Sequence, residues 1–313
     1  MQTFRDFKVG TPSQLSTRDD AWRGVLCGLE VERRRHWKPL AQRVACLAFA
    51  TARAKSPRDL LSDCGVSNAL RLAAGFTITT ALGPDSEART ERFFDETLCK
   101  NADWKRVLVK MFREVCEVEL NRQMAGASQH LAFQTVSQRV ISCLRIEGKR
   151  YRWFNSLNHG WQAMPKYDWN VDVSAGGLSW VTNGRPRTLI YRQTVPIVRN
   201  NVDLCLFDCG ADDLTKEMRT NPAAYLALGE LKGGIDPAGA DEHWKTAGSA
   251  LVRIKSAFAK HKAKPKIFFV GAAVATKMAA EIWAMLKKGD LDNAANLTDD
   301  NQLAAVTSWL CSL

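Results

Sequence analysis

Two charged residues close an apolar run in the second half of the chain, and together they could support metal-dependent hydrolysis. Glu230 and Lys232 follow the run at 223–228 and precede the glycine pair at 233–234. An apolar run that stops at two glycines is typical of a buried strand followed by a turn. Residues two apart in a strand share a face, so Glu230 and Lys232 are predicted to point the same way and Leu231 into the core.

A metal site needs a second acidic residue, and Asp203 is the candidate. It lies in V-D-L-C-L-F (202–207), which is predicted to be a strand. If this strand is a hairpin neighbour of the one carrying Glu230, then Asp203, Glu230 and Lys232 converge. Two carboxylates and the backbone carbonyl of Leu231 offer the oxygen ligands that Mg²⁺ prefers, and Lys232 could position or deprotonate the attacking water. The alternative is a solvated amphipathic strand, because Glu-x-Lys is common by chance.

The elements that must position these residues change in character near residue 148. Helical periodicity is found before it, at 18–35, 40–54, 65–75, 85–100, 102–124 and 128–145. After it, strands are predicted at 149–154, 188–193, 202–207, up to Glu230 and at 266–274, with helices at 240–262, 276–288 and 299–310. The predicted fold is α/β, with a mainly helical region at 1–147 and an α/β region at 148–313. The helix after Glu230 is predicted to cross over to a parallel strand at 266.

The composition favours a protein that meets a polyanion. Forty-four Lys and Arg residues face 33 Asp and Glu residues, which gives a net charge of +11. No apolar run reaches the length that spans a bilayer, and the N-terminus has no apolar signal core, so a cytoplasmic protein without a membrane partner is expected. Nine cysteines without a C-x-x-C pair indicate reduced, buried thiols. No glycine-rich phosphate loop is present.

A longer block around Glu230 resembles a known family. The residues G-E-L-K-G-G-I-D-P-A-G-A-D-E-H-W-K-T-A at 229–247 are similar to the active-site region of the AvaI/BsoBI type II restriction endonucleases, within the PD-(D/E)XK nuclease superfamily. Asp203, in N-N-V-D-L-C-L-F, fits the family's first carboxylate. The resemblance implies a PD-(D/E)XK core, a central mixed sheet flanked by helices. No proline precedes Asp203, which leaves three competing metal ligands: Asp208, Asp212 and Asp213.

The resemblance also implies an activity and its partners. The expected function is Mg²⁺-dependent, site-specific cleavage of double-stranded DNA that leaves 5′-phosphates. The expected target is a degenerate palindrome such as CYCGRG, cut by a homodimer whose two-fold symmetry matches the site. The helical region at 1–147 would embrace DNA or form the dimer. A cognate DNA methyltransferase is expected as a functional partner in the same bacterial cytoplasm.

Three further residues receive roles through the resemblance. His243, in D-E-H-W, matches a family histidine near the scissile phosphate and could accept a proton from the attacking water; otherwise it is a helix-surface histidine. Asp236 could accept a hydrogen bond from cytosine N4, or act only as a turn residue before a proline. Arg71 could contact guanine O6 and N7, or be a surface arginine.

Two other functions remain open at this point. A repair or recombination nuclease would read DNA structure instead of sequence and would cut random-sequence plasmid without discrete bands. A non-catalytic DNA-binding regulator would use the same basic charge, and its binding would ignore chelators.

Overall fold

The computed structural model describes residues 10–63, 65–75, 86–234 and 240–313. The chain forms two compact units. The first, here called the sheet unit, combines the chain up to Leu26 with Ser128–Leu313, and the second, the helical unit, is Cys27–Ala127. The chain therefore starts in the sheet unit, builds the helical unit, and returns.

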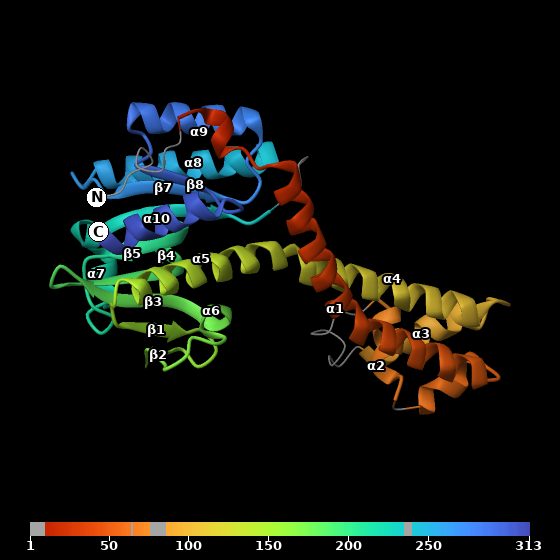
Figure 1. Ribbon diagram of the computed structural model, residues 1–313. Coiled ribbons are helices and arrows are strands. Elements are labelled where there is room, and N and C mark those ends of the chain that lie inside the picture. Colours follow the sequence, from red (N-terminus) through yellow and green to blue (C-terminus); the bar gives the residue numbers. More distant parts are fainter. Residues whose placement is uncertain (1–9, 64, 76–85, 235–239) are drawn as a thin grey trace. The chain divides into compact units, whose positions relative to one another are not determined.

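An eight-stranded mixed sheet forms the centre of the sheet unit (Figure 1). In spatial order its strands are β2 (Gly160–Ala163), β1 (Tyr151–Asn155), β3 (Ala175–Thr182), β4 (Arg185–Val195), β5 (Asn200–Phe207), β6 (Tyr225–Lys232), β7 (Lys266–Gly271) and β8 (Asn293–Asn296). Neighbours from β2 to β6 are antiparallel, whereas β6, β7 and β8 are parallel. Parallel neighbours require crossovers, which α8 (Ala240–Ala259) and α9 (Thr276–Lys288) supply. The predicted α/β class, with a parallel partner for β6, is confirmed.

Helices cover both faces of this sheet (Figure 1). On one face α8 and α9 pack with the 3₁₀ turn η2 (Pro12–Leu15), through residues such as Trp244 and Ile282. On the other, α5 (Ala127–Ile146) and α10 (Asp300–Ser312) pack through residues such as Phe133 and Trp309. β6 contributes to both cores, which explains why its sequence is a continuous apolar run without alternation. Short helices complete the unit: α6 (Val171–Ser174), α7 (Lys216–Thr220) and η5 (Pro222–Ala224).

The change from helices to strands at residue 148 does not coincide with the boundaries between the units. These fall at residues 26/27 and 127/128. α5 lies before residue 148 but belongs to the sheet unit, because its buried residues pack against strands β1, β3 and β4. The sequence pattern marks a change of secondary structure, whereas the packing of the buried α5 residues decides to which unit the helix belongs.

The helical unit has its own core. Its elements are most of α1 (Asp19–Arg53), η3 (Pro57–Ser62), α2 (Ser67–Ala73), α3 (Ser86–Phe93), the π-helical turn η4 (Phe94–Leu98) and α4 (Trp104–Ala125). The sequence predicted a break at Pro39, but α1 runs through it. A proline removes one backbone donor and destabilises a helix interior. Burial of Leu40 and Leu47 just after it holds the helix together.

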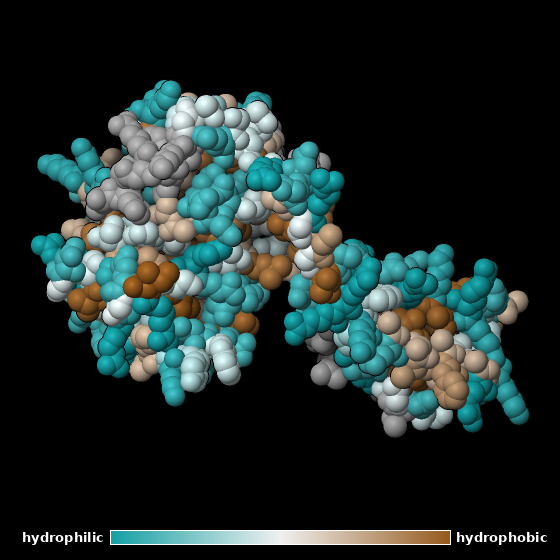
Figure 2. All heavy atoms as spheres, viewed as in Figure 1, coloured by the Kyte–Doolittle hydropathy of each residue, from teal (hydrophilic) through white to brown (hydrophobic). Residues whose placement is uncertain are grey.

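The surface is largely hydrophilic on the face that Figure 2 shows, with smaller apolar areas between the hydrophilic side chains. Within the described ranges, no helix is long and apolar enough to cross a membrane. The eight cysteines in these ranges are free thiols. Cys27, Cys46 and Cys99 are exposed, so the expectation of burial is wrong for these three.

Candidate active site

Strands β5 and β6 separate where the predicted carboxylates lie. Their pairing reaches Leu204 and Gly229 and does not continue to Asp203 and Glu230. The side chain of Asp203 takes the place of the missing strand partner, because its Oδ2 accepts a hydrogen bond of 3.0 Å from the backbone N–H of Leu231. The two strands are antiparallel neighbours, as the sequence argument required, and their pairing ends just before Asp203 and Glu230.

Asp203, Glu230 and Lys232 form one cluster where this pairing ends. Lys232 Nζ lies 2.9 Å from Glu230 Oε2 and 3.6 Å from Asp203 Oδ2. The side chain of Glu230 is only 6% exposed, and those of Asp203 and Lys232 are 15% and 22% exposed. Burying an unpaired charge is strongly unfavourable, so each of these groups depends on the others or on a ligand.

Burial and mutual charge shift the protonation of this cluster. Burial and the neighbouring Asp203 carboxylate raise the pKa of Glu230 to about 7, although the Lys232 ammonium opposes the shift. Burial alone would lower the pKa of Lys232, but the charges of Glu230 and Asp203 outweigh it and raise that pKa. Without a cation on the two carboxylates, Lys232 therefore stays protonated at neutral pH. A protonated Lys232 suits positioning and charge stabilisation, and its alternative role as a base stays a prediction.

The donor set of the cluster fits a hard divalent cation. Two carboxylates lie close enough for Asp203 to raise the pKa of Glu230, and a cation beside them would replace repulsion by attraction. The carbonyl of Leu231, the predicted third ligand, accepts a hydrogen bond of 2.7 Å from Gln129 Nε2 and keeps a second lone pair. The described residues contain no cluster of three or more His, Cys, Asp or Glu side chains that could hold a metal. A cation would therefore rely on Asp203, Glu230, a carbonyl and water.

Comparison with known proteins identifies the family. Residues 8–313 match the family model described as restriction endonuclease BsobI. The chain belongs to this family. It is 38% identical to the type II restriction enzyme AvaI of Nostoc sp., over 93% of this chain and 94% of that enzyme, and equally to AvaI of Anabaena variabilis. It is 36% identical to the type II restriction enzyme BsoBI of Geobacillus stearothermophilus over the full length of both. The resemblance seen in the sequence is thereby confirmed.

In this BsobI-family chain, the acidic residues that competed with Asp203 lie beyond the opposite end of β5: Asp208, Asp212 and Asp213. Asp208 pairs with the buried guanidinium of Arg187, and Asp212 pairs with Arg152 at 2.5 Å. Asp203 and the last residue of β5 are four positions apart, about 13 Å along an extended strand. Asp203 is the one of these four acids that lies beside Glu230.

The described structure does not test the roles of three predicted residues. Asp236 lies outside the described residues. His243 belongs to the helical range of α8, but its side chain lies outside what the structure describes. Arg71 lies on α2 in the helical unit. Their assigned contacts with water or bases therefore stay predictions.

Gln129 is a residue that the sequence did not single out. Its side-chain amide bridges the end of β6, since Nε2 donates to the carbonyl of Leu231 at 2.7 Å and Oε1 accepts from the N–H of Gly233 at 2.8 Å. The backbones approach so closely that a Cβ on Gly233 would lie 2.3 Å from the carbonyl oxygen of Ser128. α5 thus fixes the backbone on both sides of Lys232.

We expect Gln129→Ala to slow DNA cleavage about 10- to 100-fold, as removal of a supporting hydrogen bond does at metal sites. The rate constant at saturating DNA should fall and the Mg²⁺ concentration for half-maximal rate should rise, whereas DNA affinity should change little. Single-turnover kinetics across a Mg²⁺ titration measure this. Gln123→Ala, on α4, removes a 2.8 Å hydrogen bond to Glu119 and is the control. Equal rates for the two variants would contradict the assigned role.

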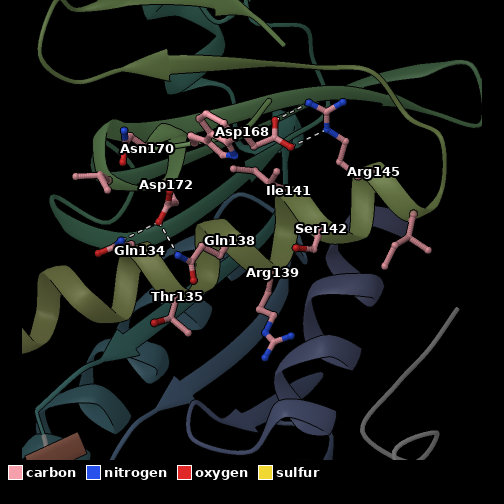
Figure 3. A pocket seen from close by; sticks show the side chains of 13 residues that line it. Gln134, Thr135, Gln138, Arg139, Ile141, Ser142, Arg145, Asp168, Asn170 and Asp172 are labelled. Carbon is pink, nitrogen blue, oxygen red and sulfur yellow. Dashed lines mark hydrogen bonds and ion pairs between the residues drawn. The ribbon is translucent and has the colours of Figure 1, made fainter. Parts of the chain in front are cut away.

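The sheet unit also has a polar hollow that none of the three clustered residues lines. It has a volume of about 960 Å³ and is lined by α5 and the segment through α6 (Figure 3). Gln134 and Gln138 donate to Asp172 at 2.8 and 2.7 Å, and Arg145 pairs with Asp168 at 2.7 Å. Its polar groups thus satisfy one another.

Proposed function

We propose that this chain is a type II restriction endonuclease that uses Mg²⁺ to hydrolyse both strands of duplex DNA at a specific sequence. The observation that carries the proposal is the meeting of Asp203, Glu230 and Lys232 where β5 and β6 diverge, in a chain of the BsobI family. A PD-(D/E)XK core requires carboxylates and a lysine at the ends of neighbouring strands, in a mixed sheet flanked by helices. We assign that core to the sheet unit.

The charge of each clustered side chain determines its proposed role. Asp203 and Glu230 would hold the cation, with the Leu231 carbonyl as a further oxygen. When bound, Mg²⁺ would activate water and stabilise the leaving oxygen. Lys232, held protonated by its neighbours, would position the phosphate and stabilise the charge that grows on it. In-line attack by water would leave a 5′-phosphate and a 3′-hydroxyl.

A protonated Lys232 leaves the proton of the attacking water to another group. This supports His243 as the acceptor, because a neutral imidazole can take a proton near neutral pH. Base contacts are proposed for two residues: Asp236 to cytosine N4 and Arg71 to guanine O6 and N7.

A homodimer is the proposed assembly. A palindrome such as CYCGRG presents the same half-site twice, and two copies related by a two-fold axis would bring one cluster to each strand. The net charge of +11 suits the phosphate backbone. The helical region at 1–147 would surround the DNA or form the dimer, and a separate methyltransferase would protect the host's own sites.

Cleavage of plasmid DNA by the purified chain tests the proposal. We expect discrete fragments with Mg²⁺, none with EDTA, and fragment ends whose sequences share one palindrome and carry 5′-phosphates. A smear would replace the proposal by a structure-reading repair nuclease. Intact DNA with a gel shift would replace it by a DNA-binding regulator, provided that an unmethylated amplicon also stays intact.

A further inference from the structure

A second polar hollow lies at the end of the sheet where β6 ends, as the candidate active site does. Its volume is about 370 Å³, and it is lined by the adjoining ends of β1, β3 and β4, by α5 and by Arg219 of α7. β4 is the antiparallel neighbour of β5, with Tyr191 opposite Leu204 and Gln193 opposite Val202. This register places Arg192, which lines the hollow, across from Asp203.

The backbone of Arg192 has an unusual conformation for its place. Its φ is +52°, in the left-handed region that L-residues rarely adopt. Five other non-glycine residues in the described ranges share a positive φ, but they lie in turns, whereas Arg192 lies inside a strand. Strain of this kind concentrates at functional sites. Here it interrupts the β4–β5 pairing across from Asp203, and the cationic side chain packs on Phe133 of α5.

The side chain of Arg192 is oriented but not neutralised. Its Cζ lies 4.4 Å from the centre of the Phe133 ring, and Phe133 is buried on α5. Stacking on an aromatic ring restrains a guanidinium while leaving its N–H groups able to donate. Arg192 is exposed, and no carboxylate in the described part of the chain lies within ion-pair distance of it.

A second guanidinium in the hollow has unused hydrogen-bonding capacity. Arg219 Nη1 donates to Gln193 Oε1 at 2.8 Å, whereas its buried Nε has no hydrogen-bond partner among the residues described. The carboxylate that lines the hollow, Asp172, already accepts from two glutamine amides. Two arginines with free donors outnumber the one carboxylate that lines the hollow, so the hollow carries a positive charge and suits an anion.

We propose that this hollow binds the sugar–phosphate backbone of the DNA strand being cut, with Arg192 and Arg219 donating to phosphate oxygens beside the scissile phosphate. Arg192 lies across the β4–β5 pair from Asp203, so the contacted phosphate would be near the one that is cut. The inference rests on the proposed nuclease function and adds Arg192 as a DNA-positioning residue.

The test is the salt dependence of DNA binding by the full chain in EDTA. Fluorescence anisotropy of a labelled duplex measures the affinity at salt concentrations between about 50 and 200 mM NaCl. Arg192→Ala should weaken binding about fivefold or more and lower the slope of log affinity against log salt by about one per bound chain. Arg192→Lys should keep most of that slope. Under Mg²⁺, Arg192→Ala should raise KM more than it lowers kcat.

Two further variants separate the guanidinium from its strained backbone. Arg192→Gly should bind as weakly as Arg192→Ala but melt a few degrees higher, because glycine accepts a φ of +52° without strain. Arg185→Ala, at the opposite end of β4, removes another exposed arginine and should leave the slope unchanged.

The outcomes distinguish this inference from the proposed function. If the wild-type chain cuts DNA and Arg192→Ala shows the slope of Arg185→Ala, the phosphate contact is refuted and the nuclease stands. If the wild-type chain binds DNA and never cuts it, the nuclease is refuted, and a reduced slope for Arg192→Ala still supports the contact. A wild-type chain that neither binds nor cuts DNA overturns both.

Discussion

Replacing Lys232 by alanine is expected to lower the single-turnover rate of DNA cleavage by about 10³-fold, in the range found when one donor to a developing charge is removed. The reason is electrostatic. Lys232 is held 2.9 Å from Glu230 and 3.6 Å from Asp203 and stays protonated, so it supplies the fixed positive side chain of the cluster. Quenched cleavage assays with enzyme in excess measure the rate.

The same substitution should leave DNA affinity in EDTA within about threefold, because a single side chain carries a small part of a phosphate-dominated interface. Lys266→Ala is a control, since that lysine pairs with Asp292 at 2.8 Å near the start of β7. An equal loss of binding and cleavage in Lys232→Ala would contradict the assigned role.

Replacing Glu230 by glutamine should abolish cleavage and also stabilise the fold. Glutamine has nearly the same shape but cannot supply the negative charge that holds a cation, so the cleavage rate should fall at least about 10³-fold. Burial and Asp203 raise the pKa of Glu230 to about 7, which means that the folded chain disfavours its ionised form. Removing that charge should raise the free energy of unfolding at alkaline pH.

The pH dependence has a definite sign. Between about pH 4.5 and 7 the folded chain keeps a proton on Glu230 that the unfolded chain has lost, so wild-type stability falls as pH rises through this window. Glutamine does not titrate. In EDTA, Glu230→Gln should therefore exceed the wild type by on the order of 2 kcal/mol at pH 8 and by little at pH 5. Thermal melts at both pH values measure this, and a variant less stable than the wild type at pH 8 would contradict the account.

The central part of the site could be predicted because its signals are local. Short stretches of sequence show each of them: the apolar run of β6, the glycine pair after Lys232 and the strand around Asp203. Antiparallel pairing of two strands then brings Asp203 to Glu230. The apolar run also indicated a buried strand. It did not show that the Glu230 side chain is itself buried, which together with Asp203 raises its pKa to about 7.

Other features depend on contacts between distant residues. Gln129 bonds Leu231 across 102 positions, and nothing in its own surroundings distinguishes it from other helix glutamines. Likewise β8 is short, and both Asn293 and Asn296 are buried, so it has neither an alternating nor a long apolar pattern. Asn296 is tolerated there because its amide donates to the carbonyl of Leu15. Such partners are set by the fold.

The most direct test of the central claim compares Asp203 on β5 with Asp212, which lies in the turn after that strand. Single-turnover cleavage of an unmethylated duplex with Mg²⁺ is measured for the wild type, Asp203→Asn and Asp212→Asn. Asp203 lies in the cluster with Glu230 and Lys232, whereas Asp212 is exposed and pairs with Arg152. We predict Mg²⁺-dependent cleavage by the wild type and Asp212→Asn at similar rates, and at least about 10³-fold slower cleavage by Asp203→Asn. Cleavage by Asp203→Asn at the wild-type rate would show that the metal site lies elsewhere.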